Sequence, residues 1–476
     1  MLICFRHRTR VVPLFLLLAS PSAMAAVTIS ASIETNLHYT LDCQAELIPC
    51  TRQALVVDEW HTSGDIEQTL NYWRDARQRN TRSTTQQPIA AEPLPMPNFF
   101  SALPDAGSQL ADSADLPFLT DHLTSEFEQR WSGEAQPHLR RIATQLRWEL
   151  RQPPIQMALS AAAQFFGATA DDLPQVVLVA IRDARFGSRA QLRGDTMYVE
   201  TALGESVYDR LPVVAHESVH YWAGRMRAQQ ASKLASVFHE SDSHCASIAF
   251  GLFDEAIASA IGNGYFERLI RSDQAFDAYL KLPESFYADP IIDLAAKALL
   301  PLVSEYLDDG RALDVTFIEQ YIQLTARTLA NHCNSLALQL RTSGYWLANT
   351  DMLEASQVST RALGSATVLT DVATTGTSAA LVAFQGLSGI IMTPSGDVRR
   401  LPAFDADMLD ALTESLKEND TFVLGWSRNA HASLYVVVAP DSIRASQLLI
   451  QMVALKRQRF SGVWLPPPLP GSRTSD

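Results

Sequence analysis

The sequence has few cysteines and no long apolar run. Only 5 of its 476 residues are cysteine, and no two of them form a Cys-x-x-Cys pair, which argues against a zinc site built from thiolates. Beyond the N-terminal segment, no stretch approaches the ~20 consecutive apolar residues that a membrane-spanning helix needs. We therefore expect no stable membrane span and no cysteine-rich metal fold.

The chain also lacks an excess of positive charge. It carries 38 basic and 52 acidic side chains, a formal net charge of -14. This balance argues against proteins that follow the phosphates of nucleic acids and against adhesion to anionic lipid. The 47% of hydrophobic residues is ordinary for a globular protein, and the length is sufficient for two or three domains.

The first 25 residues have the three parts of a secretory signal peptide. Three arginines precede an apolar run at Val11–Ala19, and a small-residue cleavage site ends at Ala25. We expect an exported protein, periplasmic or secreted, that starts near Ala26. The alternative is an uncleaved N-terminal helix buried in the fold.

Export changes how the remaining cysteines are interpreted. Four cysteines follow the signal segment, an even number in an oxidising compartment, so two disulfides are expected. A short loop closed by Cys43 and Cys50 and a long one closed by Cys245 and Cys333 are the natural pairing. Four cysteines allow three connectivities, and the sequence does not choose among them.

The hydrophobic periodicity predicts an α+β protein with several regions. A small N-terminal region at 26–81, with a strand-like Val27–Ile33 and a helical pattern at Asp65–Arg77, leads into a linker at 82–118. A mainly helical domain at 119–345 should follow, then a small α/β domain at 366–458 and a disordered tail at 459–476. Predicted helices lie at 119–131, 137–150, 155–166, 246–261, 291–306, 317–340, 406–416 and 442–456, and predicted C-terminal strands at 368–369, 380–384, 389–392, 421–426 and 433–438.

Two predicted strands precede the most informative helix. Gln175–Ile181 is a β-branched run and Thr196–Glu200 a second one, with turn-forming glycines between them. We interpret the pair as a β-hairpin that leads into an apolar helix at Leu211–Trp222.

That helix contains the sequence His216-Glu217-Ser218-Val219-His220. Positions i and i+4 of a helix are about 40° apart around the axis and about 6 Å apart along it, so both imidazoles can grip one ion. Glu217 stands on the turn between them, where a carboxylate can take a proton from water and return it to a leaving group. This is the helical zinc pattern of metalloproteases, and we expect Zn²⁺. The alternative is that the two histidines bind no metal and are partly buried in a packed helix.

A catalytic zinc needs a third protein ligand, and three positions are candidates for it. Met226 occupies the place where a metzincin would carry a histidine, so that arrangement is excluded. Glu255 lies in an apolar helix at Ala246–Ile261, where a carboxylate is costly unless it is paired or metal-bound. His244 has polar neighbours that can hold it in water, and it is about 16 Å along the helix axis from Glu255. Glu255 is therefore the expected third ligand.

The residues from Gln175 to Ile261 resemble the gluzincin superfamily of zinc peptidases, in which one helix supplies two histidines and the next a glutamate. The resemblance implies hydrolysis of a peptide or protein substrate, with its main chain paired to the Thr196–Glu200 strand as the edge of a zincin-like domain. Thermolysin-like members place an aspartate four residues after the ligand glutamate. Ser259 stands there in this chain, which implies a weaker site or another partner for His216.

Gluzincins often supply a tyrosine or histidine to the oxyanion from a position downstream of the glutamate. Tyr265 and Tyr287 both lie downstream of Glu255, and spacing does not separate them. We take Tyr287 as the candidate, with packing in the core as its alternative role.

Two functions of different kinds remain. The first is an exported zinc peptidase with Glu217 as general base. The second is a noncatalytic zincin-like binding or structural protein whose C-terminal domain recognises a partner. The intact Glu217 favours the first, because a structural zinc site usually takes four protein ligands and gains nothing from that carboxylate.

Overall fold

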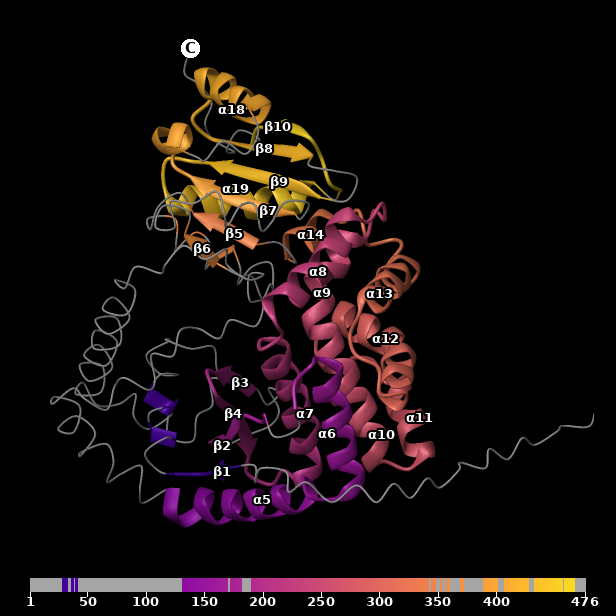
Figure 1. Cartoon of the computed structure of the whole chain (residues 1–476). Coiled ribbons are helices and arrows are strands. Elements are labelled where there is room, and N and C mark those ends of the chain that lie inside the picture. The colour runs from indigo at the N-terminus through magenta and orange to yellow at the C-terminus, as the bar shows by residue number, and fades with distance from the viewer. Residues whose placement is uncertain are drawn as a thin grey trace, which may run out of the picture.

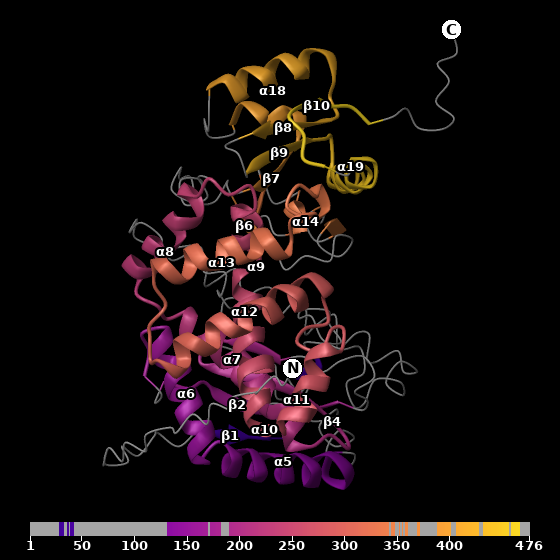
Figure 2. The ribbon, with the colours of Figure 1, turned by 90° about the vertical axis from the view of Figure 1, so that its right-hand side faces the viewer.

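The chain folds as an α+β protein in which a helical body carries two separate sheets (Figures 1 and 2). This computed structural model describes residues 28–32, 36–37, 39–41, 131–169, 172–181, 190–341, 344–347, 352, 355, 358–359, 369–371, 388–400, 406–427, 432–456 and 458–466. The predicted signal segment, the helical pattern at 65–77, the linker and both Cys43 and Cys50 lie outside these residues.

The first sheet packs against helices α5 and α7. Its strands are β1 (Ile29–Ser30), β2 (Gln175–Ile181), β3 (Ala190–Arg193) and β4 (Thr196–Ala202), in the order β1-β2-β4-β3. Pro153 and Pro154 occupy the first turn of α6 (Pro153–Phe165), where a missing N–H costs nothing, and so separate it from α5 (Gln136–Glu149). Helix α5 runs along the base of the molecule (Figure 1).

The predicted hairpin of β2 with β4 is wrong. These strands pair in parallel, from Gln175 opposite Thr196 to Ile181 opposite Ala202. The hairpin is formed by β3 and β4, which turn at Gly194 with a φ of 55°. Residues Thr196–Glu200 are therefore paired with a strand on both sides, and among the described residues β3 and β1 are the edge strands of this sheet. Strand periodicity records which face is buried but not the direction of the neighbour, so the sequence could not show this.

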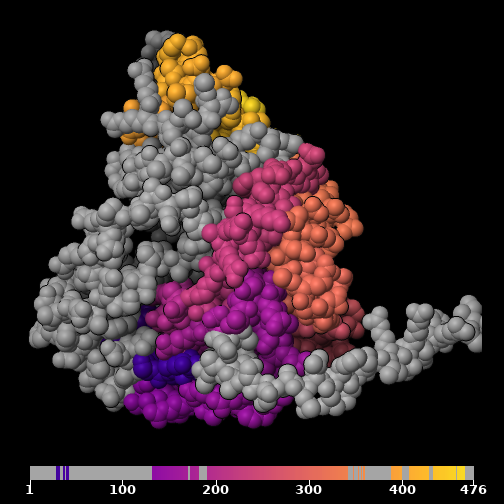
Figure 3. All heavy atoms as spheres, viewed as in Figure 1, coloured from indigo at the N-terminus to yellow at the C-terminus, as the bar shows by residue number. Residues whose placement is uncertain are grey.

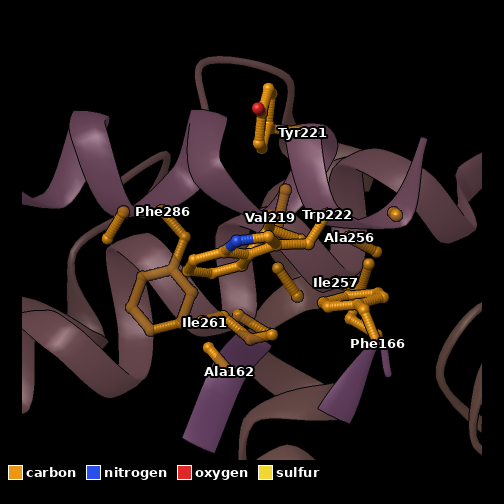
Figure 4. Close-up of a cluster of buried hydrophobic side chains, with 14 of the residues drawn as sticks. Ala162, Phe166, Val219, Tyr221, Trp222, Ala256, Ile257, Ile261 and Phe286 are labelled. Carbon is orange, nitrogen blue, oxygen red and sulfur yellow. The ribbon is translucent and has the colours of Figure 1, made fainter. Parts of the chain in front are cut away.

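The helical body follows β4. It consists of α7 (Val207–Ala223), α8 (Ala228–Glu240), α9 (Ala246–Ser259), the π-helix η4 (Ala260–Phe266), α10 (Glu267–Ile270), α11 (Asp273–Lys281), α12 (Pro290–Asp308) and α13 (Val315–Thr328). The space-filling view shows these helices adjoining one another along one side of the molecule (Figure 3). Trp222 is completely buried at the centre, with Val219, Ile257, Ile261 and Phe286 around it (Figure 4). Its burial fixes how α7 is rotated against α9 and η4.

The predicted helix at 317–340 is two helices. Helix α13 ends at Thr328 and α14 (Leu336–Arg341) begins after a turn that contains Cys333. The turn brings Cys333 against the start of α9, where it forms a disulfide with Cys245 at a Cα–Cα distance of 5.0 Å. The expected long-range pairing is confirmed.

A second sheet lies at the far end of the body (Figure 2). Its strands are β5 (Gly344–Leu347), β6 (Leu369–Asp371), β7 (Gly389–Thr393), β8 (Phe422–Ser427), β9 (Ser433–Val438) and β10 (Gly462–Trp464), in the order β10-β8-β9-β7-β5-β6. Helices α18 (Ala406–Glu418) and α19 (Ser442–Leu455) lie where they were predicted. Strands β5 and β10 were not predicted, and β10 lies in the segment expected to be disordered. The predicted strand at 380–384 is outside the described residues.

None of the helices within the described ranges is both long and apolar enough to cross a membrane.

Candidate metal centre

Helix α7 presents the two histidines of the motif to α9. A capping box starts the helix, with the side chains of Ser206 and Asp209 each satisfying the other's backbone N–H. Apolar residues such as Leu211, Val214 and Trp222 turn one face of α7 into the core. The histidines lie four residues apart on the face toward α9 and η4, as the helical spacing predicts.

Three side chains converge as the sequence predicts. The Nε2 atoms of His216 and His220 are 3.1 Å apart, and Glu255 Oε2 lies 3.4 Å from the first and 3.7 Å from the second. Ligand atoms about 2.1 Å from a tetrahedral zinc are about 3.4 Å from one another, so this triangle has the dimensions of one face of a zinc coordination tetrahedron. No other described group of three His and carboxylate donors is as close.

The buried Oε2 atom of Glu255 supports this interpretation. It makes no hydrogen bond within the described part of the chain, although it is shielded from solvent. An ionised carboxylate oxygen in such a position is costly unless a cation compensates it. The two imidazole nitrogens face it at distances too long for good hydrogen bonds and suited to a shared ion. The donor set therefore fits a divalent metal.

Each imidazole is held from behind. His220 Nδ1 lies 2.6 Å from Asp254 Oδ1, and His216 Nδ1 lies 3.0 Å from Asn263 Oδ1. A partner on Nδ1 selects the tautomer whose Nε2 lone pair is free for a metal. Ser259 stands where thermolysin-like enzymes have an aspartate that orients a zinc-bound histidine. In this chain the side-chain amide of Asn263, eight residues beyond Glu255, contacts His216 instead. Asp254 was visible as the second acidic residue in an apolar helix, but no local signal identified Asn263.

The position of Asn263 depends on a close approach of two backbones. A Cβ atom on Gly262 would lie 2.6 Å from His216 N and 2.7 Å from His216 Cα, closer than real atoms come. Only glycine permits η4 to touch α7 at the first histidine. The π-helical winding of η4 then places Asn263 beneath the imidazole.

Substituting Gly262 by alanine should damage this contact. The added methyl meets backbone atoms that cannot rotate away, so we expect a loss of about 3 kcal/mol of unfolding free energy, with weaker zinc binding. Gly133→Ala is the control, because a Cβ atom on Gly133 would meet no other atom within 4 Å. Thermal melts and zinc titrations compare the two. Equal, small effects of both variants would contradict the proposed contact.

Glu217 is not one of the three clustered donors. It is partly exposed on α7, and burial raises the pKa of its carboxyl above the ordinary value, against the opposing effect of the two imidazoles. A raised pKa brings a carboxylate closer to the range in which it can accept a proton and later release it. The role of Glu217 as a base that is not a ligand stays a prediction.

Protonation of His220 should compete with a cation. Burial of the ring, which lowers its pKa, is outweighed by the charges of Asp254 and Glu255, so the pKa stands well above 6.5. In the metal-free protein this imidazolium stabilises the fold fully below the unfolded value of about 6.5, and the stabilisation is lost as pH rises through the raised pKa. Zinc requires the neutral ring, so its binding should strengthen over the same window.

The pH dependence can be measured as a thermal shift. The rise in melting temperature on adding zinc should grow as the pH is raised above about 6.5 toward the raised pKa of His220, because the competing proton is removed. The metal-free protein should lose stability over the upper part of that range. A zinc-induced shift that does not change with pH would contradict a site containing His220.

The structure separates the two tyrosines. The ring of Tyr287 stacks on His216 with centroids 6.2 Å apart, and burial followed by the charge of Glu255 raises the pKa of its hydroxyl. Tyr265 donates its hydroxyl to Asp308 at 2.8 Å and takes no part in the cluster. Tyr287 thus remains protonated beside the three donors.

The rejected candidate ligand lies elsewhere. His244 is exposed, with Nε2 3.6 Å from the sulfur of Cys245, and it does not belong to the group of His216, His220 and Glu255. The neighbouring cysteines are bonded to one another and offer no thiolate in this state.

No protein-family model, curated protein or solved structure matches the chain. The distances among the three donor side chains, His216, His220 and Glu255, and to their supporting residues are therefore the basis for a functional assignment.

Proposed function

We propose that the chain is a zinc-dependent peptidase with a zincin-like arrangement of its catalytic helix pair. The observation that carries the proposal is the close approach of the donor atoms of His216, His220 and Glu255. The carboxylate of Glu217, on the same helix as the histidines, is not one of these donors. Zinc bound there would polarise the scissile carbonyl and make water a better nucleophile. The remaining steps belong to the side chains of the protein.

Glu217 acts as the proton carrier. Its carboxylate accepts a proton from the attacking water and then delivers that proton to the nitrogen of the departing amine, so charge balances over the cycle. Its raised pKa suits both halves of this task. Tyr287, protonated and next to the donors, supplies a hydroxyl hydrogen to the oxygen that becomes negative in the tetrahedral state.

The expected substrate strand moves from β4 to β3. Since β4 already has a neighbour on each side, an extended peptide can add only at an edge of this sheet, and of the two edge strands, β1 and β3, the four-residue β3 (Ala190–Arg193) offers the longer backbone row. Helix α7 packs against β3 as well as β4, so this edge strand contacts the helix that carries the motif. Addition of a strand supplies affinity through main-chain hydrogen bonds and is tolerant of sequence.

The proposal is tested on the purified mature protein by metal analysis and by a cleavage screen on mixed peptides. We expect one zinc per chain and hydrolysis that stops when a chelator is added and resumes with zinc. Stoichiometric zinc without cleavage of any peptide would favour the noncatalytic alternative. Absence of zinc binding would overturn the proposal.

A further inference from the structure

Helix α9 is hydrogen-bonded to the second sheet through three buried serines. Ser247, in the first turn of α9, donates its hydroxyl to Ser388 Oγ at 3.2 Å and accepts the Ser388 N–H at 3.1 Å. Ser388 Oγ also accepts the N–H of Ser433 at 3.2 Å. The three residues are 5%, 4% and 0% exposed, so these bonds form away from water.

The bridge reaches the middle of the second sheet. Ser388 immediately precedes β7 and Ser433 is the first residue of β9, and the two strands pair in parallel from Gly389 opposite Leu434. A shift of α9 along its axis would break both bonds of Ser247 at once. Buried hydrogen bonds of this kind are costly to leave unmade, so the bridge defines one position of the helix.

The same helix carries the third ligand. Eight residues separate Ser247 from Glu255, which corresponds to about 12 Å along a helix. The first turns of α9 are further held by the Cys245–Cys333 disulfide and by Tyr321, whose hydroxyl donates to Ala249 O at 3.1 Å. At its other end the segment touches α7 at Gly262. Glu255 thus lies between an anchor on the second sheet and an anchor on the histidine helix.

We propose that Ser247 is a positioning residue for Glu255, and that the C-terminal sheet belongs to the scaffold of the metal centre through it. The inference rests on the proposed zinc site. Losing the Ser247 hydroxyl releases α9 from β7 and β9, and the carboxylate of Glu255 then spends less time within reach of an ion held by His216 and His220. The C-terminal domain acquires a role in metal affinity without touching the metal.

Three alanine variants test the bridge. Ser247→Ala and Ser388→Ala should each weaken zinc binding roughly 2- to 30-fold, the range found for residues that couple distant sites. Ser446→Ala is the control, because its buried hydroxyl donates to Ile443 O within α19 and has no other hydrogen bond among the described residues, so this variant should bind zinc as the unchanged protein does. Competition with a chromophoric chelator measures the affinity, and hydrogen exchange of residues 246–259 is recorded on the same samples.

The two readouts distinguish the failure of this inference from that of the proposed function. Zinc affinity equal in all three variants, with exchange unchanged around Glu255, would overturn the inference and leave the peptidase proposal intact. If the unchanged protein bound no zinc, the proposed function would fail, and exchange alone would decide. Faster exchange that extends from Ser247 to Glu255 would still support the bridge, whereas faster exchange confined to the first turn would reject it.

Discussion

Glu217→Gln is expected to lower peptide hydrolysis at least ~10²-fold while the protein keeps its full zinc content. Glutamine has the shape of glutamate but cannot accept a proton at neutral pH, so the variant removes the base and little else. The structure keeps Glu217 out of the donor triangle, which is why occupancy should not change. Turnover of the best peptide substrate and zinc per chain, measured on one preparation, give both quantities.

A glutamate outside the site serves as a control for the effect of replacing any glutamate by glutamine. Glu240 is exposed at the end of α8, and Glu240→Gln should leave turnover and zinc unchanged. Near-normal turnover in Glu217→Gln would show that the proton is carried by another group. Loss of zinc from that variant would instead make Glu217 a ligand, and the roles of Glu217 and Glu255 would have to be exchanged.

Glu255→Ala should remove the metal. Outer-shell partners of zinc ligands commonly account for 10- to 100-fold in affinity, so loss of a direct ligand should exceed about 100-fold. Two imidazoles alone leave half of the tetrahedral shell to water. Zinc content after dialysis against a mild chelator should fall to near zero, and hydrolysis should fall with it.

His244→Ala is the matched control for the third ligand. His244 precedes the same helix, but its side chain is exposed and lies beside Cys245, so occupancy should stay nearly complete. Full zinc in the Glu255 variant together with loss in the His244 variant would overturn the two-histidine, one-glutamate site. A site of three histidines would then be required, and the geometry around α9 would have to change.

Much of the candidate site can be predicted from short stretches of the sequence. The spacing of His216, Glu217 and His220 and the apolar face of their helix determine that two imidazoles share one side of α7, whatever the rest of the chain does. A carboxylate inside an apolar helix is equally visible, because its burial is costly without a cation, and this singled out Glu255. The disulfide between Cys245 and Cys333 could be predicted because only four cysteines follow the signal segment.

What the sequence alone determined is thus the set of elements whose signal repeats every two or 3.6 residues. The boundaries of β2, β9, α18 and α19 follow from such patterns, and the structure confirms them within one or two residues. Strand direction, the identity of the edge strand and the partner of His216 have no such periodic signal.

Only the tertiary structure decided those features, and the physical reason is contact between segments far apart in the chain. Strands β2 and β4 can pair in parallel only because the segment between them, which includes β3, brings the chain back to the end of the sheet at which β2 began. Asn263 reaches His216 because Gly262 allows η4 to touch α7 at a residue 46 positions earlier in the chain. At this contact the α-helical winding of α9 changes to the π-helical winding of η4. The serine bridge joins residues 141 positions apart. Interactions of this kind depend on the packed fold, and a local pattern of residue types cannot encode them.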